Sequence, residues 1–259
     1  MKLNRLLAAC AMFAGVASMG TASAAGVTFL IGSDVVSFHR DASYINPVFD
    51  QMANFGTKKL LFVSNFGASS ANYTAGNITI DFKPLSFIDT GADMSAYSGV
   101  YVDSVGGCCS DAGGLMAAGG AAVLTAFVGG GGSLGVGDYQ GHDFWDAILG
   151  FDAEVGVTTA GGKDGVTCED PGVSTAGGLA FGFDPSYSES CFVHQTYNPT
   201  FWTGKGYFAL QTNGSTATGT FGDWVTMASG FKDPGLPEPG SLALAGLALL
   251  GLAAARRRA

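Results

Sequence analysis

The sequence predicts an α/β fold with a parallel sheet, followed by a part rich in strands and loops. Two observations predict it. In the first half of the chain, short apolar runs alternate with segments whose apolar residues recur at helical spacing, which is typical of a parallel sheet covered by helices. After Phe151 the helical spacing fades, and Gly, Thr, Ser and aromatic residues dominate. We therefore expect one α/β domain at residues 25–232.

The expected strands of the first half are four compact apolar runs and one segment of alternating apolar and polar residues. They are Val27–Ile31, Lys59–Ser64, Ile78–Phe82, Gly99–Asp103 and Ser133–Asp138. Ile78–Phe82 alternates between apolar and polar residues, which favours a half-buried or edge strand, whereas the compact apolar runs favour buried strands.

Three helices are expected between or after these strands. Asn46 and Pro47 predict an N-cap and a first helical turn, and Gly56 ends this helix. The Ala-rich segment 115–128 predicts a buried helix, and the segment 142–149 predicts another.

The second half predicts fewer regular elements. Tyr207–Gln211 and Trp224–Ser229 have the composition of strands. Residues 161–178 and 184–199 are expected to be long loops, and the Pro/Gly-rich run 233–239 is expected to be a linker.

A Gly-rich run at 130–135 fits the dinucleotide pattern G-x-G-x-x-G, but it follows a helix and precedes a strand. The dinucleotide fold requires the reverse order, so nucleotide binding is not expected. No cofactor is predicted.

The stretch from Val27 to about Phe151 is similar to the class I glutamine-amidotransferase-like proteins, including their trehalose-utilisation branch. The residues that carry the resemblance are 97–102, 124–128 and the Gly-rich turn into 134–138. The resemblance implies a flavodoxin-like three-layer fold and a nucleophilic Cys in a G-x-C-x-G elbow. Residues 135–139 read Gly-Val-Gly-Asp-Tyr instead, so no thiolate is available there and amidotransferase activity is not expected.

The N-terminal segment 1–24 has the layout of a secretory signal peptide. Lys2 and Arg5 precede an apolar run, and Ala22-Ser23-Ala24 supplies small residues before a cleavage site between Ala24 and Ala25. The signal implies processing by signal peptidase and export. A rival lipoprotein cleavage box that ends at Cys10 has only four apolar residues before it.

The C-terminal segment has three parts in order: Pro237-Glu238-Pro239, an apolar run that extends to Ala255, and Arg256-Arg257-Arg258. This tail resembles the PEP-CTERM sorting tail of Gram-negative bacteria. The resemblance implies a short transmembrane helix at 240–259 that lies transiently in the inner membrane. It also implies recognition by an exosortase, cleavage near the Pro-Glu-Pro motif, and delivery to the cell surface or extracellular polysaccharide matrix. The alternative is a permanent membrane anchor. For an anchor the apolar run is short, since fifteen residues span about 22 Å.

The charge of the chain limits its partners. It has 12 Lys and Arg against 21 Asp and Glu, a net charge of -9, and only 13% of its residues are charged. A nucleic-acid partner would need a basic surface, so this class is excluded. Removal of the signal and the tail leaves 7 basic and 20 acidic residues, a charge near -13. This charge favours neutral glycans or cations over acidic polymers.

Four cysteines remain after signal cleavage: Cys108, Cys109, Cys168 and Cys191. An oxidising compartment favours two disulfides. Cys168 with Cys191, or a crossed pairing of Cys108 and Cys109 with those two, avoids a strained bridge between neighbours. The three histidines lack zinc-ligand spacing, so no metal site is predicted.

Polar residues follow the expected parallel strands and indicate a candidate ligand-binding rim. Asp34, Asn65, Asp103 and Asp138 lie at strand ends, and His142 follows the last. Ligands of open parallel sheets bind at such ends. Together with the tail, this favours a non-enzymatic surface or matrix protein. The alternative is an exported hydrolase or glycan-binding protein that uses these carboxylates.

Overall fold

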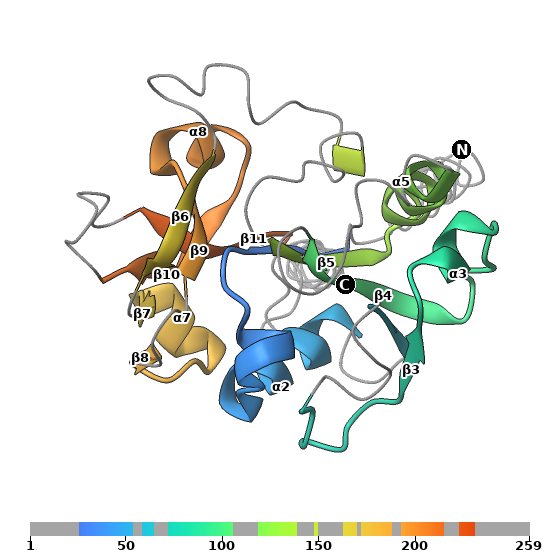
Figure 1. The fold of residues 1–259 in the computed structure, drawn as a ribbon, viewed down its shortest axis with the longest axis horizontal. Helices are drawn as coiled ribbons and strands as arrows, with labels where there is room; N and C mark the ends of the chain where they lie inside the picture. The colour runs from blue at the N-terminus through green and yellow to red at the C-terminus, as the bar shows by residue number, and fades with distance from the viewer. Residues whose placement is uncertain are drawn as a thin grey trace, which may run out of the picture.

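The computed structural model describes residues 26–53, 59–64, 72–105, 119–138, 148–149, 163–169, 172–187, 193–214 and 223–230. In these ranges the chain forms one sheet of eleven strands, with helices on both of its faces (Figure 1). The sequence prediction of an α/β fold is therefore confirmed.

Five strands form the parallel half of the sheet, in the order β3-β2-β4-β5-β1. They are β1 (Thr28–Ile31), β2 (Lys59–Val63), β3 (Ile80–Lys83), β4 (Tyr97–Val105) and β5 (Ser133–Asp138). Each overlaps a predicted strand, and β3 lies at the edge, as its alternating pattern predicted. Because this order differs from the 2-1-3-4-5 order of flavodoxin-like proteins, the flavodoxin-like class is not confirmed.

The other strands make the sheet mixed, which corrects the expectation of a parallel sheet. β11 (Trp224–Ser229) pairs antiparallel with β1, and β10 (Phe208–Asn213) pairs antiparallel with β11. β7 (Gly172–Ser174) and β8 (Ser186–Tyr187) continue this sheet, and β9 (Val193–Tyr197) joins β11 to β6 (Lys163–Glu169). The prediction that residues 161–178 and 184–199 form long loops is therefore wrong. β7 and β8 are too short to show a pattern, and pairing with neighbours defines them.

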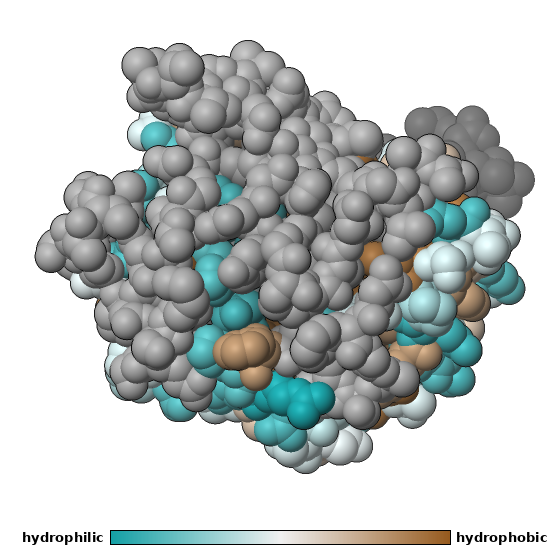
Figure 2. Space-filling model, viewed as in Figure 1, coloured by the Kyte–Doolittle hydropathy of each residue, from teal (hydrophilic) through white to brown (hydrophobic). Residues whose placement is uncertain are grey.

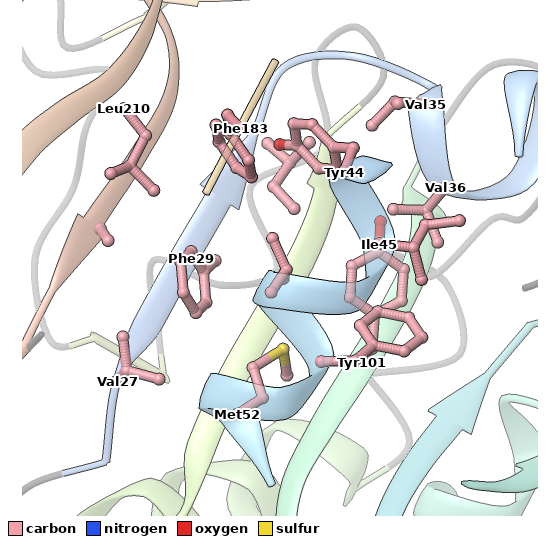
Figure 3. Close-up of a cluster of buried hydrophobic side chains, with 14 of the residues drawn as sticks. Val27, Phe29, Val35, Val36, Tyr44, Ile45, Met52, Tyr101, Phe183 and Leu210 are labelled. Carbon is pink, nitrogen blue, oxygen red and sulfur yellow. The ribbon is translucent and has the colours of Figure 1, made fainter. Parts of the chain in front are cut away.

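One face of the sheet is covered by η1 (Val35–His39), α2 (Ala42–Met52) and α7 (Ala176–Phe181). Figure 3 shows α2 lying across the strands, with Tyr44, Ile45 and Met52 directed toward the sheet. A Cβ on Gly135 would lie 2.7 Å from the Met52 sulfur, so the glycine lets the helix pack closely on β5. Tyr44 stacks on Phe183 at 4.5 Å between ring centroids.

The opposite face is covered by α3 (Ser86–Asp89), α5 (Ala121–Gly129) and α8 (Pro199–Gly204). Leu124 is the one fully buried hydrophobic residue of α5, so the expectation of a buried helix at 115–128 is corrected to a surface helix. Its apolar residues Val123, Phe127 and Val128 are only partly buried against the sheet. Residues 115–118 lie outside the described ranges.

The predicted start of α2 is wrong. Asp41, not Asn46, is its N-cap, and the Asp41 carboxylate accepts a hydrogen bond from the Ser43 amide at 2.9 Å. Pro47 lies inside the helix. The Asn46 side chain instead accepts hydrogen bonds from the amides of Thr74 and Ala75, so it holds the segment before β3.

Several predictions fall on residues outside the described ranges. They are the signal peptide and its cleavage site, Cys108, Cys109, Cys191, residues 142–147, and the tail from 231 onward. Cys168 lies in β6, and the disulfide pairings stay predictions. Among the described residues, no helix is long and apolar enough to cross a bilayer.

Candidate functional site

The three aspartates predicted at the strand ends are all buried. Asp34 follows β1 and is 6% exposed, while Asp103 in β4 and Asp138 at the end of β5 are fully buried. Asn65 and His142, predicted on the same rim, lie outside the described ranges. Burial of a carboxylate is costly unless partners stabilise it, so the surroundings of each aspartate are informative.

Asp34 lies between two imidazoles. Its Oδ1 is 3.1 Å from Nε2 of His39, and its Oδ2 is 3.3 Å from Nε2 of His194. All three side chains are less than a tenth exposed. A carboxylate and two imidazoles at these distances form a buried cluster of groups of the kind that take part in proton transfer.

The π-helix η1 brings His39 back to Asp34. The amides of Phe38 and His39 both approach the Asp34 carbonyl oxygen, at 3.0 and 3.4 Å. The wider turn of a π-helix therefore places His39, five residues on, over Asp34. Arg40 ends the turn in the left-handed region at φ 56°, which is strained for a residue with a side chain.

Gly32 brings His194 to the same carboxylate. Its carbonyl oxygen accepts hydrogen bonds from the amides of His194 and Gln195, at 2.8 and 2.9 Å. A Cβ on Gly32 would lie 2.0 Å from the Gln195 carbonyl oxygen, so only glycine allows this approach of β9 to the end of β1.

Asp103 is held by a serine from the neighbouring strand. The register pairs Val63 with Val102, which places Ser64 beside Asp103. The Ser64 hydroxyl donates to Asp103 Oδ2 at 2.6 Å, in a buried position. This short hydrogen bond to a charged acceptor helps to offset the burial of Asp103.

Asp138 is held by a tyrosine from the antiparallel part of the sheet. The Tyr197 hydroxyl, in β9, donates to Asp138 Oδ2 at 3.1 Å. Burial raises the pKa of Tyr197 well above its ordinary value, and the charge of Asp138 and this hydrogen bond raise it further. Tyr197 therefore stays protonated and remains a donor.

Tyr101 connects these groups electrostatically. Burial raises its pKa well above the ordinary value, and the charges of Asp103 and Asp34 add to the rise. Because β5 pairs with both β4 and β1, the three predicted aspartates lie at adjacent carboxyl ends of the parallel strands and belong to one buried polar region.

Sequence reasoning missed four residues of this region: His39, His194, Ser64 and Tyr197. His39 lies five residues after Asp34 in the sequence, and this spacing brings the two side chains together only in a π-helical turn. Ser64 was placed at the end of an expected strand but was not named as a site residue. His194 and Tyr197 lay in an expected loop, and no local pattern pointed to their partners.

No group of three His, Cys, Asp or Glu side chains is arranged to hold a metal ion in the part of the chain that the structure describes. The polar region consists of the side chains named above. It offers carboxylate acceptors, imidazoles that donate or accept, and protonated tyrosines.

Fold and site together define an α/β domain with a mixed sheet and a buried carboxylate–imidazole region at its strand ends. Residues 236–258 match the family model of the PEP-CTERM protein-sorting motif. The chain thus carries a PEP-CTERM sorting motif, which implies processing by an exosortase and export to the cell envelope or surface. The match does not extend to the α/β domain, and no curated protein and no solved structure matches the chain significantly.

Proposed function

We propose that this protein is a surface or matrix protein that an exosortase cuts near Pro237-Glu238-Pro239, and that its released α/β domain binds extracellular polysaccharide without catalysing a reaction. The observation that carries the proposal is the sorting motif at 236–258. Its arginine cluster would stay cytoplasmic while the domain before Pro237 is outside the inner membrane, in agreement with the expected signal peptide.

Two features support a binding role for the domain. The charge near -13 expected after processing disfavours acidic polymers and is compatible with neutral glycans as ligands. Residues 135–138, at the position of the amidotransferase elbow, form the end of β5 and contain neither Cys nor Ser. We therefore do not propose that the domain acts through a Cys or Ser nucleophile at this position.

The experiment that tests sorting replaces the motif and follows the protein. In a host that carries an exosortase, alanines at Pro237, Glu238 and Pro239 should leave the protein in the membrane fraction, while the natural chain is released. Pro234→Ala, a proline substitution just outside the matched residues, is the control and should be released normally. Equal release of the triple variant and the natural chain would contradict the proposal.

A hydrolase of neutral glycans is the second candidate, and one observation favours it. Asp34 lies 3.1 and 3.3 Å from two imidazole nitrogens, and such pairs can transfer protons during hydrolysis. Release of new reducing ends from a neutral polysaccharide, lost in Asp34→Asn, would support this candidate. No release at any pH between about 5 and 9, a range that includes the usual titration of His, would reject it.

A further inference from the structure

The described chain enters and leaves the sheet at the same edge. The first residues of the five parallel strands lie together at this edge, which we call the amino edge: Thr28, Lys59, Ile80, Tyr97 and Ser133. The first residue of β1, Thr28, pairs with the last residue of β11, Ser229. The path to the sorting motif therefore starts at the amino edge, while the buried aspartates lie at the opposite edge.

Two contacts join the entry and the exit of the chain to the turn between α5 and β5. The Tyr207 hydroxyl forms hydrogen bonds with the side chains of Thr28 and Ser229. A Cβ on Gly26 would lie 2.2 Å from the Gly132 carbonyl oxygen, so the residue before β1 packs directly on the turn 130–132. Entry, exit and turn therefore form one continuous part of the amino edge.

The helix that leads into this turn has an uncharged surface. The 26 residues from 112 to 137 contain no charged side chain, although about a quarter of the residues of an average soluble domain are charged. In α5, Thr125 and Ala126 are exposed and Phe127 is partly buried. An uncharged surface can approach lipid headgroups without desolvating an ion, and it adds nothing to the repulsion between an acidic domain and anionic lipids.

The distance from the sheet to the tail limits which edge can face a membrane. Nine residues, 231–239, separate Gly230 from the apolar run of the tail. The r.m.s. end-to-end distance expected of a linker of this length is about 15–18 Å. β4 has nine residues, so it is about 30 Å long. To turn the opposite edge to the membrane, the linker would have to run the length of such a strand.

Contact between α5 and lipid would be weak without the tail. Among the described residues, the large hydrophobic side chains that are exposed are Phe38, Val173 and Leu179, and none belongs to α5 or to the turn 130–132. The described surface in Figure 2 is mostly hydrophilic, with isolated hydrophobic patches. A tether raises the effective concentration of a weak contact, and cutting the tether removes this gain.

We propose that the amino edge, with the last turn of α5 and the turn 130–132, contacts the lipid surface of the inner membrane while the tail holds the chain there. The buried aspartates then lie on the far side of the domain from the membrane. This proposal rests on the membrane-held stage of the proposed function and adds the face of the domain and its lipid partner. The contact ends when the tail is cut.

The test places a photoreactive side chain at each edge of the full-length chain. Benzoylphenylalanine, which reacts with neighbouring C–H bonds on illumination, replaces Ala126 at the end of α5 or Phe38 after β1. Both positions are exposed, and Phe38 is 62% exposed. The chains are produced in a host without an exosortase, where the tail is not cut, and the inner membranes are illuminated. Mass spectrometry then measures the peptides that are linked to phospholipid.

Phospholipid adducts should form from position 126 and stay at background from position 38. Thr125 is the neighbouring exposed residue, and benzoylphenylalanine in its place gives a second reporter if the chain with the label at Ala126 does not fold. Adducts from neither 125 nor 126, or an equal yield from position 38, would overturn the proposal.

The dependence on the tail has its own measurement. The released chain, labelled at position 126 and recovered from a host that carries an exosortase, is illuminated with vesicles of the inner-membrane phospholipids. It should give no adduct above background. The same yield as in the membrane-held chain would show that the contact is independent of the tether, which contradicts the proposal.

The membrane fraction distinguishes this proposal from the proposed function. If the full-length chain is not recovered with the inner membrane when the exosortase is absent, the proposed function itself fails. If the chain is recovered there and is released normally when an exosortase is present, but adducts form from position 38, the proposed function stands and the lipid-facing edge is wrong.

Discussion

Gly32 is the residue on which the position of His194 depends most directly. We expect Gly32→Ala to lower the free energy of unfolding by about 1–3 kcal/mol or more, because a Cβ would lie 2.0 Å from the Gln195 carbonyl oxygen and must push β9 away. Urea unfolding measures the loss, and the His194 ring signal reports the displacement.

Gly204→Ala is the matched control for this substitution. Nothing lies within 4 Å of a Cβ at Gly204, so the free energy of unfolding should change by less than ~1 kcal/mol. If both variants were equally stable, the close approach of β9 to β1 would be wrong.

Buried tyrosines predict a loss of stability at alkaline pH. Burial raises the pKa of Tyr207 from 10.0 to about 12, and burial raises the pKa of Tyr44 in the same direction. The folded state keeps these protons at a pH where the unfolded chain releases them. The stabilisation is therefore complete below pH about 10 and decreases as the pH rises toward about 12, by at most ~1.4 kcal/mol per pH unit for each tyrosine.

Tyr207→Phe tests this dependence. Urea unfolding at several pH values above about 9 should show a shallower fall for the variant than for the natural chain, because one titrating group has been removed. A natural chain whose stability stays constant up to pH about 12 would contradict the burial of these hydroxyls.

At the scale of elements, α2 gives the sharpest contrast between the sequence prediction and the structure. Asp41→Ala should lower the free energy of unfolding by about 1 kcal/mol and reduce amide protection in the first turn of α2, because the cap to Ser43 is lost. Asn46→Ala should instead release the amides of Thr74 and Ala75 and leave that first turn protected.

Hydrogen exchange measures both variants. If Asn46→Ala loses amide protection at the start of α2 and Asp41→Ala does not, the sequence prediction of an N-cap at Asn46 is correct. Both residues are good N-cap types. Only tertiary contacts of Asn46 with the segment before β3 distinguish them, and the sequence does not show those contacts.

The elements that could be predicted are those with a strong local pattern. β1, β2, β4 and β5 are buried runs, and β10 and β11 have strand composition, so each was expected close to its observed place. β7 and β8, with three and two residues, exist because neighbours pair with them. The same distinction between local pattern and tertiary pairing applies to the site. The aspartates could be predicted because they are polar residues at the ends of apolar strands. His194 could not, because it lies beside Asp34 only through the hydrogen bonds around Gly32.

At the scale of the whole molecule, the mixed sheet explains why the site joins distant parts of the chain. β1 lies between the parallel strand β5 and the antiparallel strand β11, so its end meets both halves of the sheet. A local reading of the first half predicted a parallel sheet and could not include the partners that β9 supplies. The sorting motif, in contrast, is a continuous segment and was recognisable from the sequence alone.

We propose above that the tail directs processing and release of this domain. The most direct measurement is the intact mass of the protein recovered separately from the membranes and from the extracellular fraction of a host that carries an exosortase. We expect an extracellular species that begins at Ala25 and ends near Pro237. A membrane species that ends at Ala259, with no shorter extracellular form, would contradict the claim and identify the protein as a permanently anchored domain.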